Sequence, residues 1–318
     1  MMIKDLIESG ECPVDSLFMV KQQTKAVSTN GSSYLSLTLQ DNSGVLDGKM
    51  WAITESDVQI TAPGSIVRIY GQMQNYKGHP QLRINEVDAV ELNEVELEKF
   101  IPKAPCDLEL LKKRVDEYIN MIKDEQLKRI THTLIYNYYD SYTRYPAAVT
   151  VHHAYYGGLM YHSASICSMA IQVQKRYPVL SLDYLISASL LHDIGKVKEL
   201  SGFTVVNYTL QGNLIGHISL GAMMVYEEGR KEKMDGEKLT VLIHMILAHH
   251  GEYEFGSPKK PMTREAYVLH VLDDLDAKME CLRNSFDSTE DGAFTNRIPW
   301  MDNSTFYKPF PLDEKNGK

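Results

Sequence analysis

The stretch SLLHDIGK at residues 189–196 ends an apolar run with a histidine and an aspartate side by side. The run is typical of a buried helix, so His192 and Asp193 are expected at its C-terminal end. A carboxylate there meets the unfavourable end of the helix dipole, and it is costly to bury without a partner. The charge of Asp193 therefore requires a cation, and a metal ion shared with His192 would provide one.

The composition is that of an ordinary globular chain. Its 318 residues are enough for two domains, and 43% are hydrophobic and 24% charged. No apolar run reaches the about 20 residues of a membrane span, and the acidic start does not resemble a secretory signal. The cysteines lie far apart and predict four separate thiols in a reducing cytoplasm: Cys12, Cys106, Cys167 and Cys281.

The net charge of −9 excludes a generally basic coat for nucleic acid. It does not exclude a local phosphate site, because bound metal ions add positive charge that the formal count omits.

Residues 1–92 are expected to form a small β barrel. Short runs of period two alternate with turn residues there, which predicts about five strands. The runs are residues 34–40, 45–51, 65–71 and 81–84, and the turns are Asp41–Gly44, Pro63–Gly64 and Tyr76–Gly78. The order of strands and turns resembles the OB-fold of nucleic-acid-binding proteins.

That resemblance implies single-strand binding by stacking of bases on aromatic rings beside a few cations. The candidates are Tyr34, Trp51, Tyr70, Tyr76, Lys49, Lys77 and Arg83. The alternative is that these aromatic residues belong to the core of the barrel.

The rest of the chain has helical periodicity. Acidic residues and paired prolines in 93–106 predict a linker, residues 107–298 an all-α domain, and 299–318 a C-terminal tail. One β-rich insert, 203–208, predicts a hairpin or extended loop, followed by a turn at 211–213. The fold class is therefore multidomain α and β.

Eight of the 11 histidines lie between positions 152 and 250. On five helices, an imidazole or carboxylate is expected to face inward, and the set is His162, His192, Asp193, His217, His249, His250 and Asp273. Mixed nitrogen and oxygen ligands suit transition metals. Seven ligands exceed one ordinary site but suit two ions bridged by one carboxylate, which can clamp a phosphoryl group and activate water.

The segment from His152 to Met279 resembles the HD-domain superfamily of metal-dependent phosphohydrolases. More narrowly, the chain resembles the YhaM family of bacterial 3′→5′ exoribonucleases, which also carry an OB-like domain ahead of the HD domain. The stretches that carry the resemblance are HHAYYGGL at 152–159, LLHDIGK at 190–196, GNLIGHI at 212–218, HHGEYEFGSPK at 249–259 and DDLDAKM at 273–279.

The resemblance implies how the ligands are shared. One ion is expected on His162, His192, Asp193 and Asp273, and the second on His217, His249 and His250, with Asp193 bridging. Lys196 is expected to contact the scissile phosphate or the leaving oxygen; the alternative is a solvated lysine at a helix end. Manganese is the first expectation for both ions, and cobalt, iron, nickel or zinc would also suit these ligands.

Further residues are weaker candidates. His152 and His153 precede a Gly-Gly turn and are expected to contact phosphate or backbone. Lys259 lies in a short basic patch that would guide a phosphate backbone. His244, His270 and Asp276 are expected to orient ligands rather than to bind metal.

The resulting prediction is a cytoplasmic, metal-dependent exoribonuclease that degrades single-stranded RNA, with single-stranded DNA as a further substrate, to nucleoside monophosphates. One alternative is an HD phosphohydrolase that acts on a nucleotide or cyclic dinucleotide, and another is a non-catalytic RNA-binding module. The aromatic stretch 306–310 predicts packing on its own domain or on a neighbouring subunit, and a homo-oligomer is expected.

Overall fold

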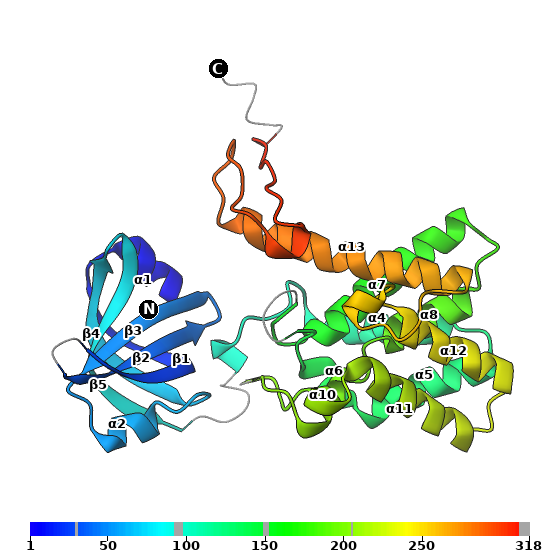
Figure 1. Ribbon diagram of the computed structural model, residues 1–318, viewed down its shortest axis with the longest axis horizontal. Helices are drawn as coiled ribbons and strands as arrows, with labels where there is room; N and C mark the ends of the chain where they lie inside the picture. The colour runs from blue at the N-terminus through cyan, green and yellow to red at the C-terminus, as the bar shows by residue number, and fades with distance from the viewer. Residues whose placement is uncertain (29–30, 92–97, 149–152, 205, 312–318) are drawn as a thin grey trace. The chain divides into compact units, whose positions relative to one another are not determined.

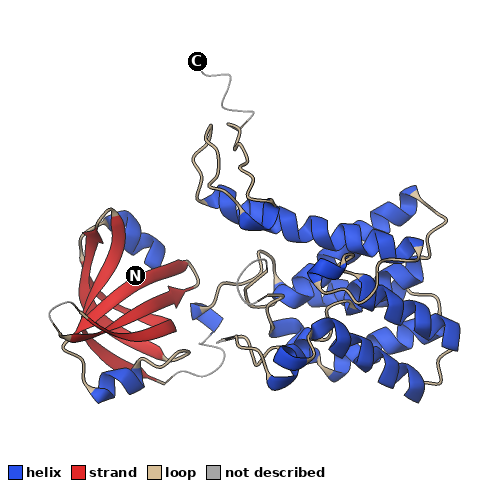
Figure 2. Ribbon diagram, in the orientation of Figure 1, coloured by secondary structure: helices blue, strands red, loops and turns tan. Residues whose placement is uncertain are grey.

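The computed structural model describes residues 1–28, 31–91, 98–148, 153–204 and 206–311. The chain divides into two compact units: Met1–Lys103 with Gly202–Val206, and Ala104–Ser201 with Asn207–Lys318. The strands of the described residues lie in the first unit, and most of the helices lie in the second (Figure 2). The division falls inside the predicted linker, of which residues 93–97 lie outside the described part.

The first unit is a closed five-stranded barrel with the order β1-β2-β3-β5-β4. Its elements are α1 (Ile3–Ser9), β1 (Pro13–Val27), β2 (Ser33–Asp41), β3 (Gly44–Trp51), α2 (Glu55–Ile60), β4 (Ile66–Tyr76) and β5 (His79–Val90), as Figure 1 shows. β3 and β5 pair in parallel, and the other neighbours are antiparallel. The predicted barrel is confirmed.

The alternation along β2 separates an inner from an outer face of the barrel. Leu35, Leu37 and Leu39 are fully buried. Because successive side chains on a strand point to opposite faces, Tyr34 and Ser36 lie on the outside. Tyr34, the aromatic residue of β2, is therefore not part of the core.

The second unit is helical, as predicted. Its helices are α4 (Leu108–Met121), α5 (Glu125–Asn137), α6 (Tyr139–Arg144), α7 (Gly158–Arg176), α8 (Leu182–Leu191), α9 (Lys196–Glu199), α10 (Leu210–Leu214), α11 (His217–Lys231), α12 (Gly236–Ala248) and α13 (Arg264–Asp287). Short 3₁₀ turns are η1 (Glu98–Phe100) in the first unit, and η2 (Tyr253–Phe255) and η3 (Pro299–Met301) in the second. Among the described helices, none is long and apolar enough to cross a membrane.

Helix α8 lies at the centre of the helical unit. It packs against α4, α5, α7, α12 and α13, and its residues 185–191 are all buried. A helix that is apolar on every side is stable only when neighbours cover it. Helix α8 ends in the middle of the unit, and His192 and Asp193 are the next two residues.

The insert after α9 has one of its two predicted forms, whereas the turn predicted after it is a helix. Leu200 and Tyr208 form one isolated antiparallel bridge, so residues 203–208 form an extended loop and not a hairpin of strands; Val205 lies outside the described part. The predicted turn at 211–213 lies inside α10, because the hydroxyl of Thr209 accepts from the backbone N–H of Gly212 and caps the helix.

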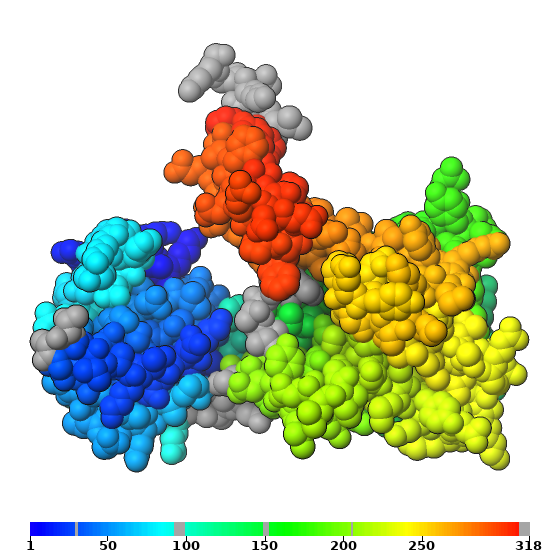
Figure 3. All heavy atoms as spheres, in the orientation of Figure 1, coloured from blue at the N-terminus to red at the C-terminus, as the bar shows by residue number. Residues whose placement is uncertain are grey.

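The predicted tail begins as part of a hairpin. Antiparallel bridges join Phe294 to Tyr307 and Ile298 to Ser304, and the Lys308 ammonium donates to the carbonyl oxygens of Phe286 and Thr289. The hairpin thus packs on the end of its own helix α13. In Figure 3, its red atoms project beyond the other helices of this unit. Residues 312–318 lie outside the described part.

Candidate metal centre

His192 and Asp193 are delivered together by the end of α8. They are 0% and 2% exposed. The Nδ1 of His192 donates to the carbonyl of Ser189 at 2.9 Å, which directs Nε2 away from the helix. The turn that follows requires glycine at position 195, because a Cβ there would lie 1.9 Å from the carbonyl oxygen of His217. Gly195 therefore allows the start of α11 to approach.

One group of ligand atoms gathers around the Oδ2 atom of Asp193. The Nε2 atom of His192 lies 3.4 Å from that oxygen and 3.3 Å from the Nε2 atom of His162 on α7. The Oδ1 atom of Asp273 on α13 lies 3.0 Å from the same nitrogen of His162. Three helices thus bring two imidazoles and two carboxylates together.

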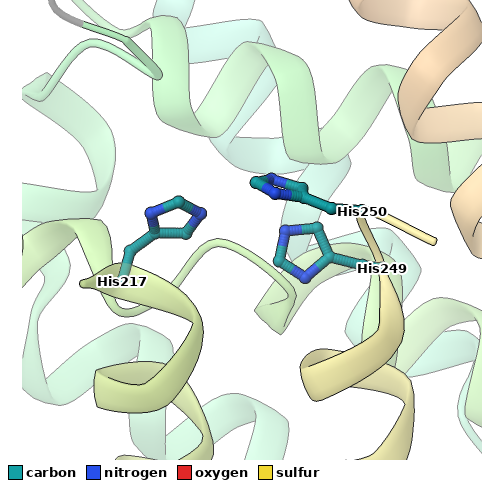
Figure 4. Close-up of side chains that lie close together, drawn as sticks. All are labelled: His217, His249 and His250. Carbon is teal, nitrogen blue, oxygen red and sulfur yellow. The ribbon is translucent and has the colours of Figure 1, made fainter. Parts of the chain in front are cut away.

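A second group faces the other carboxylate oxygen of Asp193. Its Oδ1 atom lies 3.4 Å from Nε2 of His217 and 3.8 Å from Nε2 of His249. His217, His249 and His250 face one another from the start of α11 and the end of α12 (Figure 4). Within the described residues, the Oδ1 of Asp193 and the Nε2 of both His217 and His249 are buried and have no hydrogen-bond partner.

All five imidazoles use Nδ1 for a hydrogen bond to an oxygen. The pairs are His162 with Asp276 at 2.7 Å, His192 with Ser189 at 2.9 Å, His217 with Glu199 at 3.1 Å, His249 with Ile246 at 2.7 Å and His250 with Phe255 at 2.7 Å. Carbonyl and carboxylate oxygens only accept, so Nδ1 carries the proton. A ring with its proton on Nδ1 can present the lone pair of Nε2, which is how a metal-binding histidine is held.

The charges of the centre follow from burial and from its close neighbours. Burial alone would raise the pKa of Asp193, but Lys196, His192 and His217 lower it well below its ordinary value, so the carboxylate is ionised. Burial lowers the pKa of His249 well below its ordinary value, and His250 and His192 add to this effect, so that ring is neutral. An ionised carboxylate beside a neutral imidazole is the state that binds a cation.

Burial also lowers the pKa of His162, but this effect is outweighed. Hydrogen bonds to Asp273 and Asp276 raise the pKa of His162 to about 9. Without a cation at Nε2, a proton on that nitrogen accounts for the 3.0 Å contact with Asp273.

This arrangement fits divalent transition-metal ions. Bonds of about 2.1 Å place neighbouring ligands of one ion about 3.0–3.4 Å apart, close to most of the separations around Asp193. The donor set of imidazole nitrogens and carboxylate oxygens is that of such ions. The buried nitrogens and oxygen without partners would otherwise cost stability.

Lys196 lies inside the centre and not in solvent. Its side chain is 9% exposed, and its ammonium forms an ion pair with the Oδ2 atom of Asp193 at 2.7 Å. The alternative of a solvated helix-end lysine is therefore wrong. The ion pair places a positive charge next to the proposed bridging carboxylate.

Sequence analysis missed Glu199. Its Oε1 atom accepts from both the backbone N–H and the Nδ1 of His217, at 2.9 and 3.1 Å. Glu199 belongs to no motif or periodic pattern of the sequence, and its partner His217 lies 18 residues further along the chain. Asp276 accepts from His162, which agrees with the orienting role expected of it.

The other candidate histidines have different positions. His152 lies outside the described residues. The substrate contact expected of His153 is not supported, because its ring is 2% exposed and both nitrogens are bound, to Asp276 and to the Tyr155 hydroxyl. His270 contacts the carbonyl of His249, but His244 accepts from the backbone of Met262, away from the ligands.

The barrel brings some of the nucleic-acid candidates together. Tyr34 and Trp51 are cross-strand neighbours on β2 and β3, with ring centroids 4.5 Å apart. The ammonium of Lys49 lies 5.2 Å from the centroid of Tyr34, and Lys49 is paired with Arg83 on β5. These four residues form one outer face with exposed aromatic and cationic groups, here called the aromatic face.

Tyr76 and Lys77 lie apart from the aromatic face. They lie at the β4–β5 turn, before the part of β5 that pairs with β3, whereas Trp51 is the last residue of β3. These two residues therefore do not extend the aromatic face. Lys259 is exposed in the loop after η2 of the helical unit.

Comparison with known proteins identifies both units. A family model described as "HD domain" matches residues 159–278, and one described as "OB-fold nucleic acid binding domain" matches residues 19–90. A curated protein of Listeria monocytogenes serotype 4b, named "3'-5' exoribonuclease YhaM", is 40% identical over 95% of this chain and 96% of its own. Proteins of the same name from Bacillus subtilis and Halalkalibacterium halodurans are 38% and 37% identical, over 96% and 93% of this chain and 97% and 93% of their own.

Solved structures with some similarity to this chain include single OB-fold domains. The second OB-fold domain of replication protein A from Methanococcus maripaludis covers 26% of this chain and 87% of its own, at 16% identity and a TM-score of 0.22. A likeness at this level carries no functional argument.

Proposed function

The chain belongs to the YhaM family of 3′-5′ exoribonucleases, and we propose that it degrades single-stranded RNA from the 3′ end in a metal-dependent reaction. The observation that carries this proposal is the convergence of buried imidazoles on the two oxygens of Asp193. Nucleoside monophosphates are the proposed products. The cytoplasm is the proposed location, and single-stranded DNA as a substrate and a homo-oligomeric assembly stay predictions.

We assign the ligands to two ions. His162, His192, Asp193 and Asp273 would hold one ion, and His217, His249 and His250 with the second oxygen of Asp193 would hold the other. Manganese is the proposed ion at both positions. When bound, two such ions neutralise phosphate charge and activate water for attack on the phosphodiester.

The residues of the chain prepare the site for this chemistry. Hydrogen bonds at Nδ1 keep the five rings from turning, so no ligand has to reorganise during the reaction. The Lys196 ammonium, 2.7 Å from Oδ2 of Asp193, supplies a cation for the scissile phosphate or the leaving 3′-oxygen. Burial strengthens each of these electrostatic contacts.

The aromatic face is the proposed contact for RNA upstream of the reacting end. Tyr34 and Trp51 offer ring faces to bases, and Lys49 and Arg83 offer charge to phosphates. A duplex hides its base faces inside the helix, so this contact favours a single strand.

A 5′-labelled single-stranded RNA incubated with Mn²⁺ tests the proposal. We expect a ladder that shortens from the 3′ end, together with release of nucleoside monophosphates. Intact RNA with hydrolysis of a small phosphoester would favour the nucleotide phosphohydrolase, and no metal-dependent turnover would contradict both enzymes.

Asp273→Asn and Asp274→Asn form a matched pair for the metal assignment. Asp273 faces His162, whereas its neighbour Asp274 forms an ion pair with Lys278 on the surface. We expect Asp273→Asn to lower RNA degradation at least about 1,000-fold, because several kcal/mol of charge stabilisation depend on the ion. Asp274→Asn should stay within about twofold of wild type, because it breaks only a surface ion pair; equal losses in both variants would contradict the assignment.

A further inference from the structure

Beside the metal centre, a buried chain of hydrogen bonds links Tyr155 to His153, His153 to Asp276 and Asp276 to His162. We propose that His153 and Tyr155 are positioning residues that act through Asp276 to hold His162 in its metal-binding orientation. This inference rests on the proposed function only in taking His162 as a metal ligand.

Asp276 is the link between the ligand and the residues behind it. Its Oδ2 atom lies 2.7 Å from Nδ1 of His162 and 2.7 Å from Nε2 of His153. The hydroxyl of Ser165 donates to the other oxygen, Oδ1. A carboxylate that accepts three hydrogen bonds, two from α7 and one from the loop before it, has one orientation, and it fixes the rings that donate to it.

The orientation of His153 is set from its far side. Its Nε2 carries the proton that Asp276 accepts, so Nδ1 of the neutral ring is an acceptor. The hydroxyl of Tyr155, which also interacts with Glu280, lies 2.6 Å from that Nδ1 and is its hydrogen-bond partner. Without this hydroxyl, the ring could turn or adopt the other tautomer, and Asp276 would lose a donor.

The backbone supports the same arrangement. His153 has a φ of 50°, in the left-handed region that residues other than glycine rarely adopt. Its carbonyl accepts from the N–H of Ala147 at 3.1 Å, and a Cβ at position 158 would lie 2.0 Å from that oxygen, so glycine is required there. A strained residue held by its surroundings points to a functional constraint, and here the constraint brings the imidazole of His153 to Asp276.

His153, His162 and Asp276 could also be taken for a third metal site, because their ligand atoms lie close together. The distances argue against it. The separations of 2.7 Å between Asp276 and both rings are those of hydrogen bonds, whereas two ligands of one ion lie about 3.0–3.4 Å apart.

Mn²⁺ binding to the metal-stripped full-length protein tests the inference, with calorimetry for affinity and elemental analysis for stoichiometry. Loss of a residue behind a metal ligand typically weakens metal binding about 10–100-fold. We therefore expect His153→Phe to weaken one Mn²⁺ about 10-fold and to leave the second unchanged. His153→Gln, whose amide can still donate to Asp276, should restore part of the affinity.

Tyr155→Phe removes only the hydroxyl and should weaken the same ion by a smaller factor, about threefold, because one more residue separates it from the ligand. Tyr161→Phe is its matched control, since that ring lies 5.6 Å from the ring of His153 and its hydroxyl has no place in the chain of hydrogen bonds. Thermal unfolding of each metal-free variant reports whether the fold is intact. Tyr155→Phe tests the inference even where His153→Phe does not fold.

Three results would bear on the inference differently. Unchanged Mn²⁺ affinity in folded His153→Phe and Tyr155→Phe would overturn it. Three ions in wild type and two in His153→Phe would also overturn it, because His153 would then be a ligand. Expected metal binding without RNA degradation would contradict the proposed function and still support the positioning role.

Discussion

Asp193 is the residue around which both groups of proposed ligands gather. It is 2% exposed, and its two oxygens face different groups of imidazoles. Lys196 offsets part of its charge, but the Oδ1 atom has no hydrogen-bond partner among the described residues. A cation at Oδ1 would satisfy the buried oxygen that these neighbours leave without a hydrogen bond.

Glu199 holds the ring of His217, which belongs to the second group of proposed ligands. It binds His217 through both the backbone N–H and the ring Nδ1. We predict that Glu199→Ala weakens one of two Mn²⁺ ions about 10–100-fold and leaves the other unchanged. Glu199→Gln should lose less, because its amide oxygen still accepts one of these bonds. Calorimetric titration with Mn²⁺ measures both effects, and equal weakening of both ions would argue against separate ligand groups.

At the scale of elements, the helices are positioned by their ends as well as by their apolar faces. Asp124 illustrates this at the start of α5. Its carboxylate accepts from the N–H groups of Gln126 and Leu127 and pairs with Lys238 on α12 at 2.5 Å. One residue thus caps a helix and ties it to another helix, which ends in two of the proposed metal ligands.

The stabilisation by Asp124 should depend on pH. Burial raises its pKa, but Lys238 and the two N–H groups lower it below the ordinary value of 3.8. A lowered pKa in the folded state means that the stabilisation is complete at neutral pH and is lost as the pH falls below about 4. We expect Asp124→Ala to lower the free energy of unfolding by about 1–2 kcal/mol at pH 7, and Asp124→Asn, which keeps the cap, by about 0.5–1 kcal/mol.

Urea unfolding followed by circular dichroism between pH 7 and pH 3 tests this. The difference between wild type and Asp124→Asn should shrink toward the acid end, where the carboxyl group becomes neutral. A difference that stays constant with pH would show that the charge of Asp124 does not stabilise the fold.

At the scale of the whole molecule, the two units have separate cores. The barrel presents Tyr34 and Trp51 outside its core, and the helical unit holds the proposed ligands in buried or half-buried positions. The proposed division is that the barrel holds the strand while the helical unit carries out the hydrolysis.

Removal of the aromatic pair should therefore separate binding from chemistry. Stacking of one base contributes about 1–3 kcal/mol, so we expect Tyr34→Ala with Trp51→Ala to raise KM for an RNA oligonucleotide about 10-fold or more. Hydrolysis of bis(p-nitrophenyl) phosphate, which is too small to span both units, should be unchanged. Steady-state kinetics with both substrates measures this, and Tyr76→Ala, at the end of β4, is the control. A similar KM increase in the control would contradict the aromatic face.

The sequence by itself determined the features that repeat or cluster along the chain. Period two in residues 34–51 predicted the barrel strands, and the order of histidines and aspartates from 162 to 273 predicted which residues the helices bring together. Such patterns are visible because one apolar face recurs at the spacing of its own element.

Only the tertiary structure decided how the ligands are held. Glu199 is joined to His217 by two hydrogen bonds across 18 residues of chain, and His153, supported by Tyr155, is joined to Asp276 by one hydrogen bond across 123 residues. The close approach at Gly195 and the short helix that replaces the predicted turn at 211–213 also depend on a distant or non-periodic partner. A single contact between distant residues leaves no periodicity in the sequence, and its partner is defined only once the helices have packed.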